Sequence, residues 1–180
     1  MAVETGEIAK IERPRKIYGQ HVEYMFETQA TRVWKQLYDE GRLNAAQRRF
    51  WESKPPEELY DLLNDVDEID NLADSPTHRA VLNRLRQVQQ DWIVESRDLG
   101  FLPEDEIHSR SAGSTPYELA QDDSKYPLAK ILRTAELAAS LATDGIDELR
   151  RALIDEDSAV RYWAALGLLM RGEAGVLATE

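Results

Sequence analysis

Apolar side chains recur along most of this chain at spacings of three and four residues, which is the period of an amphipathic α-helix. The first such stripe runs from Val22 to Tyr38 and predicts one helix across that range. Gly41 follows the stripe and can adopt the left-handed conformation that ends a helix. Asn44 and Gln47 then stand three positions apart, as in a capping box, and predict a short second helix that ends near Trp51.

The pattern changes after a pair of consecutive prolines. ELYDL at 58–62 is too short for an independent helix and precedes the turn-rich NDVDEIDN, so it predicts a short strand. Ser75 and Pro76 supply an N-cap and a first-turn proline for a longer helix, which Gly100 and Pro103 close. The stripe that this helix is expected to bury consists of Val81, Leu82, Leu85, Val88, Trp92 and Ile93.

Residues 109–126 lose the apolar period and gain Ser, Gly and Asp, so we predict a connection between two packed units there. Thr115, Pro116 and Glu118 still predict one short helix within it, because they supply a cap, a first-turn proline and a capping-box carboxylate. The predicted domain limits are 1–110, a linker at 111–126 and a helical segment at 127–180.

Three more apolar stripes follow Pro127 and predict helices stacked as hairpins. They cover residues 128–138, 146–153 and 160–168. Gly167 lies in the third stripe, where its missing side chain predicts a close helix crossing despite a helix cost of about 1 kcal/mol relative to alanine. The fold class predicted by the whole pattern is mainly α with a small β element.

Composition adds a strongly acidic balance, with 34 acidic and 22 basic side chains among 180 residues and a formal net charge of -12. We expect no nucleic-acid partner, because a phosphate backbone is bound by releasing counterions to Lys and Arg. We expect no membrane partner either, since no stretch approaches the ~20 apolar residues of a membrane span. Glu4 and Glu7 stand where a signal peptide needs an apolar core, so none is expected in this chain and the compartment stays open.

Candidate reactive groups are few. The chain has no cysteine, which excludes a thiolate nucleophile and a Cys-ligated zinc. His21, His78 and His108 are too far apart in sequence for a local metal motif. The acidic turn at 65–71 suggests a calcium loop, but Ile69 occupies a ligand position and no glycine follows, so a solvated turn is favoured.

The tryptophans allow two interpretations, a sugar-stacking platform or hydrophobic core. Three of the four fall on or beside predicted helical stripes, which favours the core. The four tryptophans are Trp34, Trp51, Trp92 and Trp163.

Two strings resemble known families. ELYDLLNDVDEIDNLA at 58–73, followed by a Trp-bearing helix, resembles the ELYDL-x-x-DP-x-E-x-x-NLA stretch in the C-terminal subdomain of type I sulfatases, most like the N-sulphoglucosamine sulphohydrolase type. The bacterial branch of this family is resembled by two further stretches, RVWKQLYDEGRLNAAQRRFWESKPPEELYDL upstream and RDLGFLPEDEIHSRSAGSTPYELA downstream. The resemblance therefore covers roughly residues 15–170. Val66 stands where the family usually has Pro. DEDSAVRYWAALGLL at 155–169 is similar to the second helix of a HEAT-like repeat, with Asp157 as its cap and Arg161 pointing to a neighbouring unit.

The resemblance implies a sulfatase C-terminal subdomain followed by HEAT-like helical hairpins. A complete sulfatase needs a C/S-x-P-x-R string converted to formylglycine, and a calcium ion held by Asp and Asn. The nearest match to this motif is Ser75-Pro76-Thr77-His78-Arg79, whose proline comes one place too early. The other near match, Ser53-Lys54-Pro55-Pro56-Glu57, lacks the arginine. We therefore predict no catalytic residue and no metal ligand in this chain. Arg15 and His21 match a region near the mouth of the family's cleft and are candidates for contact with an anionic sugar.

The leading hypothesis is a non-catalytic C-terminal part of a sulfatase that braces an N-terminal catalytic domain and edges its cleft; the parent family is usually periplasmic or secreted. Its predicted partners are that domain or a second copy, through the apolar helix at 160–170. An alternative is a free-standing, acidic helical interaction module. A third is a poorly folding remnant, because the strand at 58–62 has no visible partner and an isolated pair is marginal.

Overall fold

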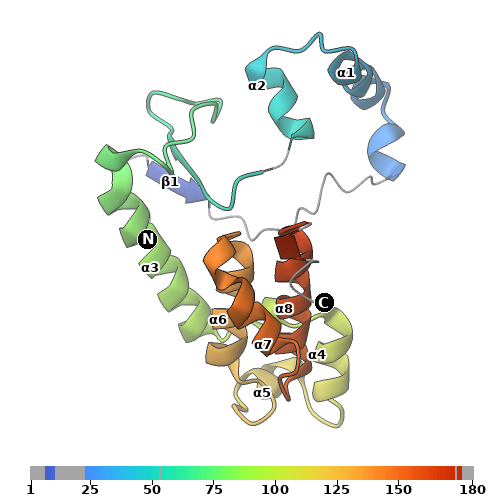
Figure 1. The fold of residues 1–180 in the computed structure, drawn as a ribbon, viewed down its shortest axis with the longest axis vertical. Coiled ribbons are helices and arrows are strands. Elements are labelled where there is room, and N and C mark those ends of the chain that lie inside the picture. Colours follow the sequence, from blue (N-terminus) through green and yellow to red (C-terminus); the bar gives the residue numbers. More distant parts are fainter. Residues whose placement is uncertain (1–6, 11–22, 53, 173, 176–180) are drawn as a thin grey trace. The chain divides into compact units, whose positions relative to one another are not determined.

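The computed structural model describes residues 7–10, 23–52, 54–172 and 174–175, and its elements are mainly helical (Figure 1). The chain divides into two compact units, Met1–Arg79 and Ala80–Glu180. The strands are β1 (Glu7–Lys10) and β2 (Glu58–Asp61). The helices, with η marking a 3-10 turn, are η1 (Glu23–Phe26), α1 (Gln29–Asp39), α2 (Ala45–Arg48), η2 (Arg49–Trp51), η3 (Pro76–His78), α3 (Arg79–Ser96), η4 (Leu99–Phe101), α4 (Glu104–Arg110), α5 (Pro116–Ala120), α6 (Leu128–Ala139), η5 (Thr143–Gly145), α7 (Ile146–Ala152) and α8 (Ser158–Met170). The mainly helical class with a small β element is confirmed.

The predicted single helix from Val22 to Tyr38 is wrong, because the chain breaks at Thr28. Val22 lies outside the described residues. η1 ends at Phe26, Thr28 adopts an extended conformation with ψ 132°, and α1 begins at Gln29. The Thr28 hydroxyl donates to the Met25 carbonyl at 3.3 Å, which is the kind of local bond by which threonine competes with helix formation.

The predicted end of α1 and start of α2 are confirmed. Gly41 has φ +68°, and its N–H donates to Tyr38 O at 3.0 Å while the N–H of Arg42 donates to Leu37 O at 2.9 Å. These two bonds form a Schellman cap, which glycine adopts without steric cost. Asn44 and Gln47 form the predicted capping box, with reciprocal bonds of 2.9 and 3.1 Å.

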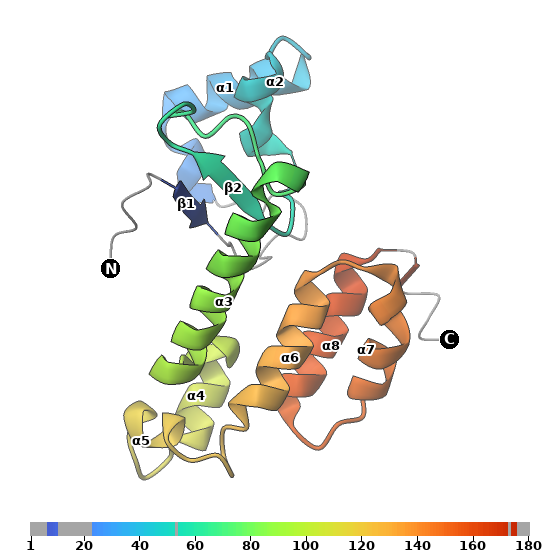
Figure 2. The same ribbon diagram turned by 90° about the vertical axis from the view of Figure 1, so that its left-hand side faces the viewer.

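The strand predicted at 58–62 is confirmed as β2, and its partner is β1. The two strands pair antiparallel in the register Glu7 with Asp61 through Lys10 with Glu58 (Figure 2). Leu59 and Tyr60 of β2 are buried. EIAK is too short for a periodic signal, which is why sequence inspection found no partner for β2.

The second unit is built around α8, which packs against both α6 and α7 (Figure 2). The three helices predicted after Pro127 are therefore confirmed, although their assignment to the HEAT type stays a prediction. Their shared core extends to η4 and α5 and includes Ile93, Phe101, Leu119, Tyr126, Leu128, Ile131, Leu132, Leu149, Val160, Trp163 and Leu168. The Trp163 indole donates to Phe101 O at 2.8 Å, which satisfies its buried N–H.

The predicted linker takes part in this core. Its short helix is confirmed as α5, with Thr115 and Glu118 forming the expected capping box. Leu119 and Tyr126 are buried. The domain limits 1–110, 111–126 and 127–180 stay a prediction, but residues 111–126 supply packing to the unit Ala80–Glu180 rather than only connecting helices.

α3 buries only part of its predicted stripe. Leu82 and Ile93 are buried, whereas Val88 is exposed and Trp92 is 60% exposed. At about 100° per residue the six predicted positions spread over roughly two-fifths of the helix circumference, and only one side of that arc is covered. The core prediction for Trp92 is therefore wrong, while Trp163 is buried and Trp34 and Trp51 are half-buried. In the part of the chain that the structure describes, no helix combines the length and apolarity that a membrane crossing requires.

Both ends of α8 are held by side chains. Asp157 caps its start as predicted, accepting from the N–H groups of Ala159 and Val160 at 2.8 and 3.2 Å. The predicted role of Arg161 is wrong, because its guanidinium donates to the carbonyls of its own loop, Asp155 and Glu156, at 2.7 and 2.9 Å.

Arg171 holds the other end of α8. It donates to Gly167 O of α8 at 2.7 Å and to Leu137 O and Ala142 O, at the end of α6, at 2.9 Å each. A cation at the carboxyl ends of two helices satisfies carbonyls that have no partner within either helix.

Gly167 confirms the predicted close crossing. A Cβ atom built there would lie 2.8 Å from Ala138 Cβ, 2.9 Å from Ala138 Cα and 3.0 Å from Leu149 Cδ1. The backbones of α6 and α8 approach too closely for any side chain at this position.

We predict that Gly167→Ala lowers the free energy of unfolding by about 1–2 kcal/mol, because overpacking outweighs the gain in helix propensity. Chemical denaturation would measure it. Ala138→Gly removes the nearest methyl group, so it should cost less in the Gly167→Ala background than in the wild-type chain. Equal costs in both backgrounds would show that this crossing does not limit side-chain size.

Candidate functional site

The segment 58–73, which carries the sulfatase resemblance, is organised by Asn71. Its Oδ1 accepts from the N–H of Leu59 at 2.9 Å and from that of Ala73 at 3.0 Å, and its Nδ2 donates to Glu57 O at 3.0 Å. The N–H of Leu72 donates to Leu59 O at 2.7 Å. Asn71 and Leu72 thus satisfy both backbone groups of Leu59, as a further strand would.

Asp61 at the end of β2 and Asp65 in the acidic turn that follows use their carboxylates within this turn. Asp65 accepts from the N–H groups of Ile69 and Asp70 at 2.9 and 2.8 Å. The Asn64 amide and the Leu63 N–H donate to Asp61, and these bonds hold the pKa of that carboxyl below its ordinary value. Both oxygens of Asp65 and of Asp61 are therefore engaged within the turn, which does not suit a calcium loop. Val66 is exposed here, so no packing is lost where the family usually has Pro.

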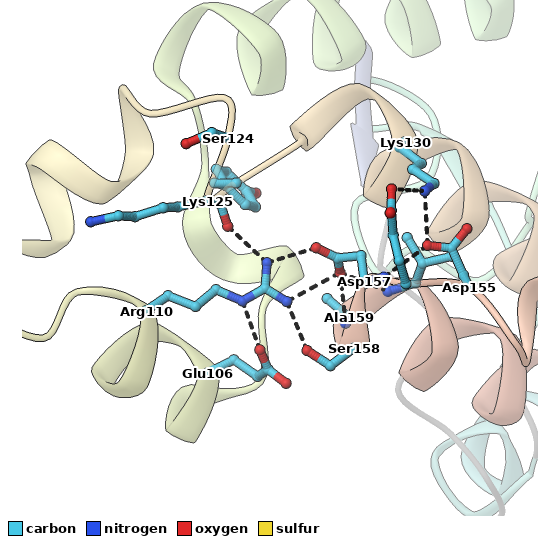
Figure 3. Close-up of polar contacts among 12 residues, drawn as sticks. Glu106, Arg110, Ser124, Lys125, Lys130, Asp155, Asp157, Ser158 and Ala159 are labelled. Carbon is cyan, nitrogen blue, oxygen red and sulfur yellow. Dashed lines mark hydrogen bonds and ion pairs between the residues drawn. The ribbon is translucent and has the colours of Figure 1, made fainter.

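A second polar cluster centres on Arg110 at the end of α4 (Figure 3). Its guanidinium donates to both oxygens of Asp157 at 2.8 and 3.1 Å, to Glu106 Oε2 at 2.7 Å and to Ser158 Oγ at 2.9 Å. A further bond of 2.8 Å reaches Lys125 O. The side chains of Arg110 and Asp157 are only 14% and 11% exposed, so the cluster ties α4 and the turn after α5 to the start of α8.

The charges in this cluster are stabilised as they stand. Burial alone would raise the pKa of Asp157, but the Arg110 guanidinium and the N–H groups of Val160 and Ala159 outweigh it, so that pKa lies below its ordinary value. Burial would also raise the pKa of Glu106, but hydrogen bonds with Ser158 and Arg110 outweigh it, so this pKa too lies below its ordinary value. The same carboxylates raise the pKa of Arg110 against its own burial. A group whose charge is favoured this strongly does not suit acid–base catalysis near neutral pH.

The residues predicted at a substrate edge, Arg15 and His21, lie outside the described residues and stay a prediction. His78 lies next to Ser75, whose Oγ is 2.9 Å from His78 Nδ1. Ser75 makes no side-chain bond to the backbone of η3, so its predicted cap bond is wrong, while Pro76 occupies the predicted first helical position. Among the described residues, no three His, Asp or Glu side chains are placed to hold a metal ion.

Of the strings that resemble a sulfatase nucleophile, Ser53 lies outside the described residues, and two others serve as helix starts. Ser75 opens η3, and its proline follows directly. Ser114-Thr115-Pro116-Tyr117-Glu118, which sequence inspection missed, has the proline at the third place but ends in Glu instead of Arg. In the structure this string caps α5. These residues do not fit a formylglycine with its calcium ion, and no catalytic step is assigned to them.

Sequence inspection also missed Arg110 as the centre of the polar cluster. A signal was available locally, because Glu106 precedes Arg110 by four residues on the same helix. The decisive partner, Asp157, is 47 residues away and becomes visible only in the fold.

Comparison with known proteins gives one further finding. A 96-residue stretch is 33% identical to an ulvan-active sulfatase of Formosa agariphila, covering 53% of this chain and 16% of that protein. The chain contains a sulfatase-related region. It spans only about a sixth of the length of this relative. No family model matches the chain, and no solved structure does.

The match supports a sulfatase relationship for part of the chain. It does not extend to the N-sulphoglucosamine sulphohydrolase type or to the HEAT-like extension, which stay predictions.

We predict that Asn71→Ala lowers the stability of the unit Met1–Arg79 by about 1–3 kcal/mol, because it leaves the Leu59 N–H without its partner. Amide hydrogen exchange should show faster exchange at Leu59 and Leu72. Asn64→Ala is the matched control, since Asn64 makes an exposed bond of 2.6 Å to Asp61. Equal effects of the two substitutions would contradict the role given to Asn71.

We predict that Arg110→Met lowers the free energy of unfolding by about 3 kcal/mol or more at neutral pH, since it strands two partly buried carboxylates. Arg133→Met is the control, because the Arg133–Glu148 pair at 2.8 Å is exposed and should contribute less than about 1 kcal/mol. Denaturant titrations of both variants would measure the difference.

The effect of Arg110→Met should also depend on pH. The pKa values of Asp157 and Glu106 are lowered in the folded chain. Their contribution to the free energy of unfolding is therefore complete above the ordinary values of 3.8 and 4.5, and it is lost as the pH falls through the lower values of the folded chain. The gap between wild type and variant should therefore close in acid. A gap that stays constant across this range would argue against a charge-based role.

Proposed function

We propose that this chain is a non-catalytic C-terminal part of a sulfatase-related hydrolase, which braces a catalytic domain and borders its cleft. The observation that carries the proposal is the 33% identity to a sulfatase over 96 residues, a stretch that makes up 16% of that enzyme. A stretch of this size is a minor part of its relative, and in this proposal hydrolysis of the sulfate group resides in the remaining part.

The contacts within residues 58–73 support a structural role. Asn71 uses its side-chain amide on the backbone of Glu57, Leu59 and Ala73, and Asp65 uses both oxygens on its own turn. Groups engaged in this way hold a loop in shape and are not free to act on a substrate. The shape of a rigid loop is what a neighbouring domain needs for docking.

The substrate class comes from the relatives alone. The matched protein is named for activity on ulvan, and the family resemblance points to sulfated sugars. We carry over a sulfated glycan as the substrate of the complete enzyme, with Arg15 and His21 as candidate contacts at the cleft edge. Calcium and formylglycine would belong to the catalytic domain.

A chimeric enzyme tests this role. The stretch of the Formosa agariphila sulfatase that matches this chain is replaced by the corresponding stretch of this chain, and a second version carries a deletion there. We expect the chimera to release sulfate from ulvan and the deletion to lose at least ten-fold in soluble activity. Asn71→Ala should lower the yield of active chimera, and Asn64→Ala should not.

The chain itself should be inactive. Purified chain, incubated with an aryl sulfate and calcium, is expected to release no more sulfate than a protein-free blank. Turnover above the blank would contradict the non-catalytic assignment, and a chimera no more active than the deletion would contradict the bracing role.

A further inference from the structure

A groove of about 680 Å³ lies between α3 and α6, two neighbouring helices of the unit Ala80–Glu180 (Figure 2). Its lining is partly apolar and includes Ala129 and the buried side chain of Leu132 from α6. Val94 of α3 also lines it and is 52% exposed. We call this cavity the α3–α6 groove. A partner that fills it removes apolar area from water, which favours binding.

The rim of the α3–α6 groove carries more negative than positive charge. Asp91 and Glu95 come from α3 and Glu136 comes from α6, whereas Arg133 is the one cation among the described residues that line the groove. The Arg133 guanidinium is already paired with Glu148 of α7 at 2.8 Å. The groove therefore presents three carboxylates, and its one cation is engaged elsewhere.

Glu136 shows the consequence of this imbalance. Its carboxylate accepts from the Gln90 amide of α3 at 3.2 Å. Partial burial raises the pKa of Glu136, and the neutral Gln90 amide offsets this only in part. A cation placed next to this carboxylate would stabilise its charged form. A cationic partner would thus supply a group that the described lining of the groove does not offer.

The walls of the groove indicate the backbone conformation of an occupant. Both walls are α-helices, whose interior N–H and C=O groups bond within the helix. An extended peptide would find no backbone partners on them, whereas a helix satisfies its own backbone. The lining residues lie within 90–95 of α3 and 129–136 of α6, which is at most about two helical turns.

We propose that the α3–α6 groove binds a basic amphipathic helix of another protein. Apolar side chains of this helix, one turn apart, contact Val94 and Leu132, and flanking Lys or Arg side chains pair with Glu95 and Glu136. Charge complementarity selects this occupant, because a chain with a net charge of -12 attracts a cationic partner and repels a second copy of itself. An acidic helix with the same apolar pattern would bring like charges against the rim.

Fluorescence anisotropy of a labelled peptide tests the charge and the helical pattern. The probe is an amidated peptide of about 14 residues, built from Leu, Lys and Ala with the leucines on one helical face. We expect the full chain to bind it with a Kd of roughly 10 μM, and more weakly as salt rises. Two control peptides should bind at least ten-fold more weakly: a scrambled version whose leucines share no face, and a version with Glu in place of Lys.

Paired substitutions locate the charges that matter. Glu95→Gln combined with Glu136→Gln removes two carboxylates from the rim and should weaken binding of the Leu–Lys–Ala peptide at least ten-fold. Glu104→Gln combined with Asp105→Asn is the matched control, since these residues are exposed on α4, outside the groove, and their loss changes the net charge equally. The control should change the Kd less than two-fold.

A second pair of variants tests the apolar contact. Val94→Lys places a cation inside the groove and should weaken binding at least ten-fold. Val88→Lys is the matched control, because Val88 is 58% exposed on the same helix and does not line the groove. Since both valines are more than half exposed, both variants should fold, and circular dichroism would confirm it.

Three outcomes would overturn the proposal: no binding of the Leu–Lys–Ala peptide to the wild-type chain, equal binding of either control peptide, or equal effects of the groove variants and their matched controls. The proposal does not rest on the sulfatase relationship, because binding is measured on this chain alone and the chimera experiment has a separate readout.

Discussion

The burial of α8 is the constraint on which the second unit depends. Because this helix is almost uncharged and packs against both α6 and α7, the backbone groups at its two ends must find partners inside the protein. Arg110 meets this need at the start, through Asp157, and Arg171 meets it at the end. Gly167 allows the close approach of α6 that covers the inner face of α8.

The first unit solves a similar problem with an amide instead of an arginine. A pair of four-residue strands leaves backbone groups of β2 without a strand partner, and Asn71 with Leu72 takes that place. These bonds give a physical reason why the resembling segment begins with ELYDL and ends with NLA, since Asn71 and Leu72 of NLA hydrogen-bond to Leu59 of ELYDL. The acidic residues between them shape the turn that makes this return possible.

These two solutions bear on function in the same direction. Asn71 and Asp65 in the first unit and Arg110 with its partners in the second are engaged with backbone or with each other. The pKa values of Asp61, Glu106 and Asp157 are lowered, so these carboxylates are held charged rather than poised for proton transfer.

Local signals in the sequence were sufficient for the helices after Pro127, the strand at 58–62, both capping boxes, the Gly41 helix end and the cap at Asp157, because each depends on residues within one or two turns. The break at Thr28 and the exposure of Trp92 were not predicted, since period alone does not show where a helix is interrupted or which side of a wide stripe is covered. The β1–β2 pairing joins segments about fifty residues apart, and the Arg110–Asp157 pair spans 47. Such contacts are decided by the tertiary structure, because many charged residues could serve as partners in the sequence and only packing selects one.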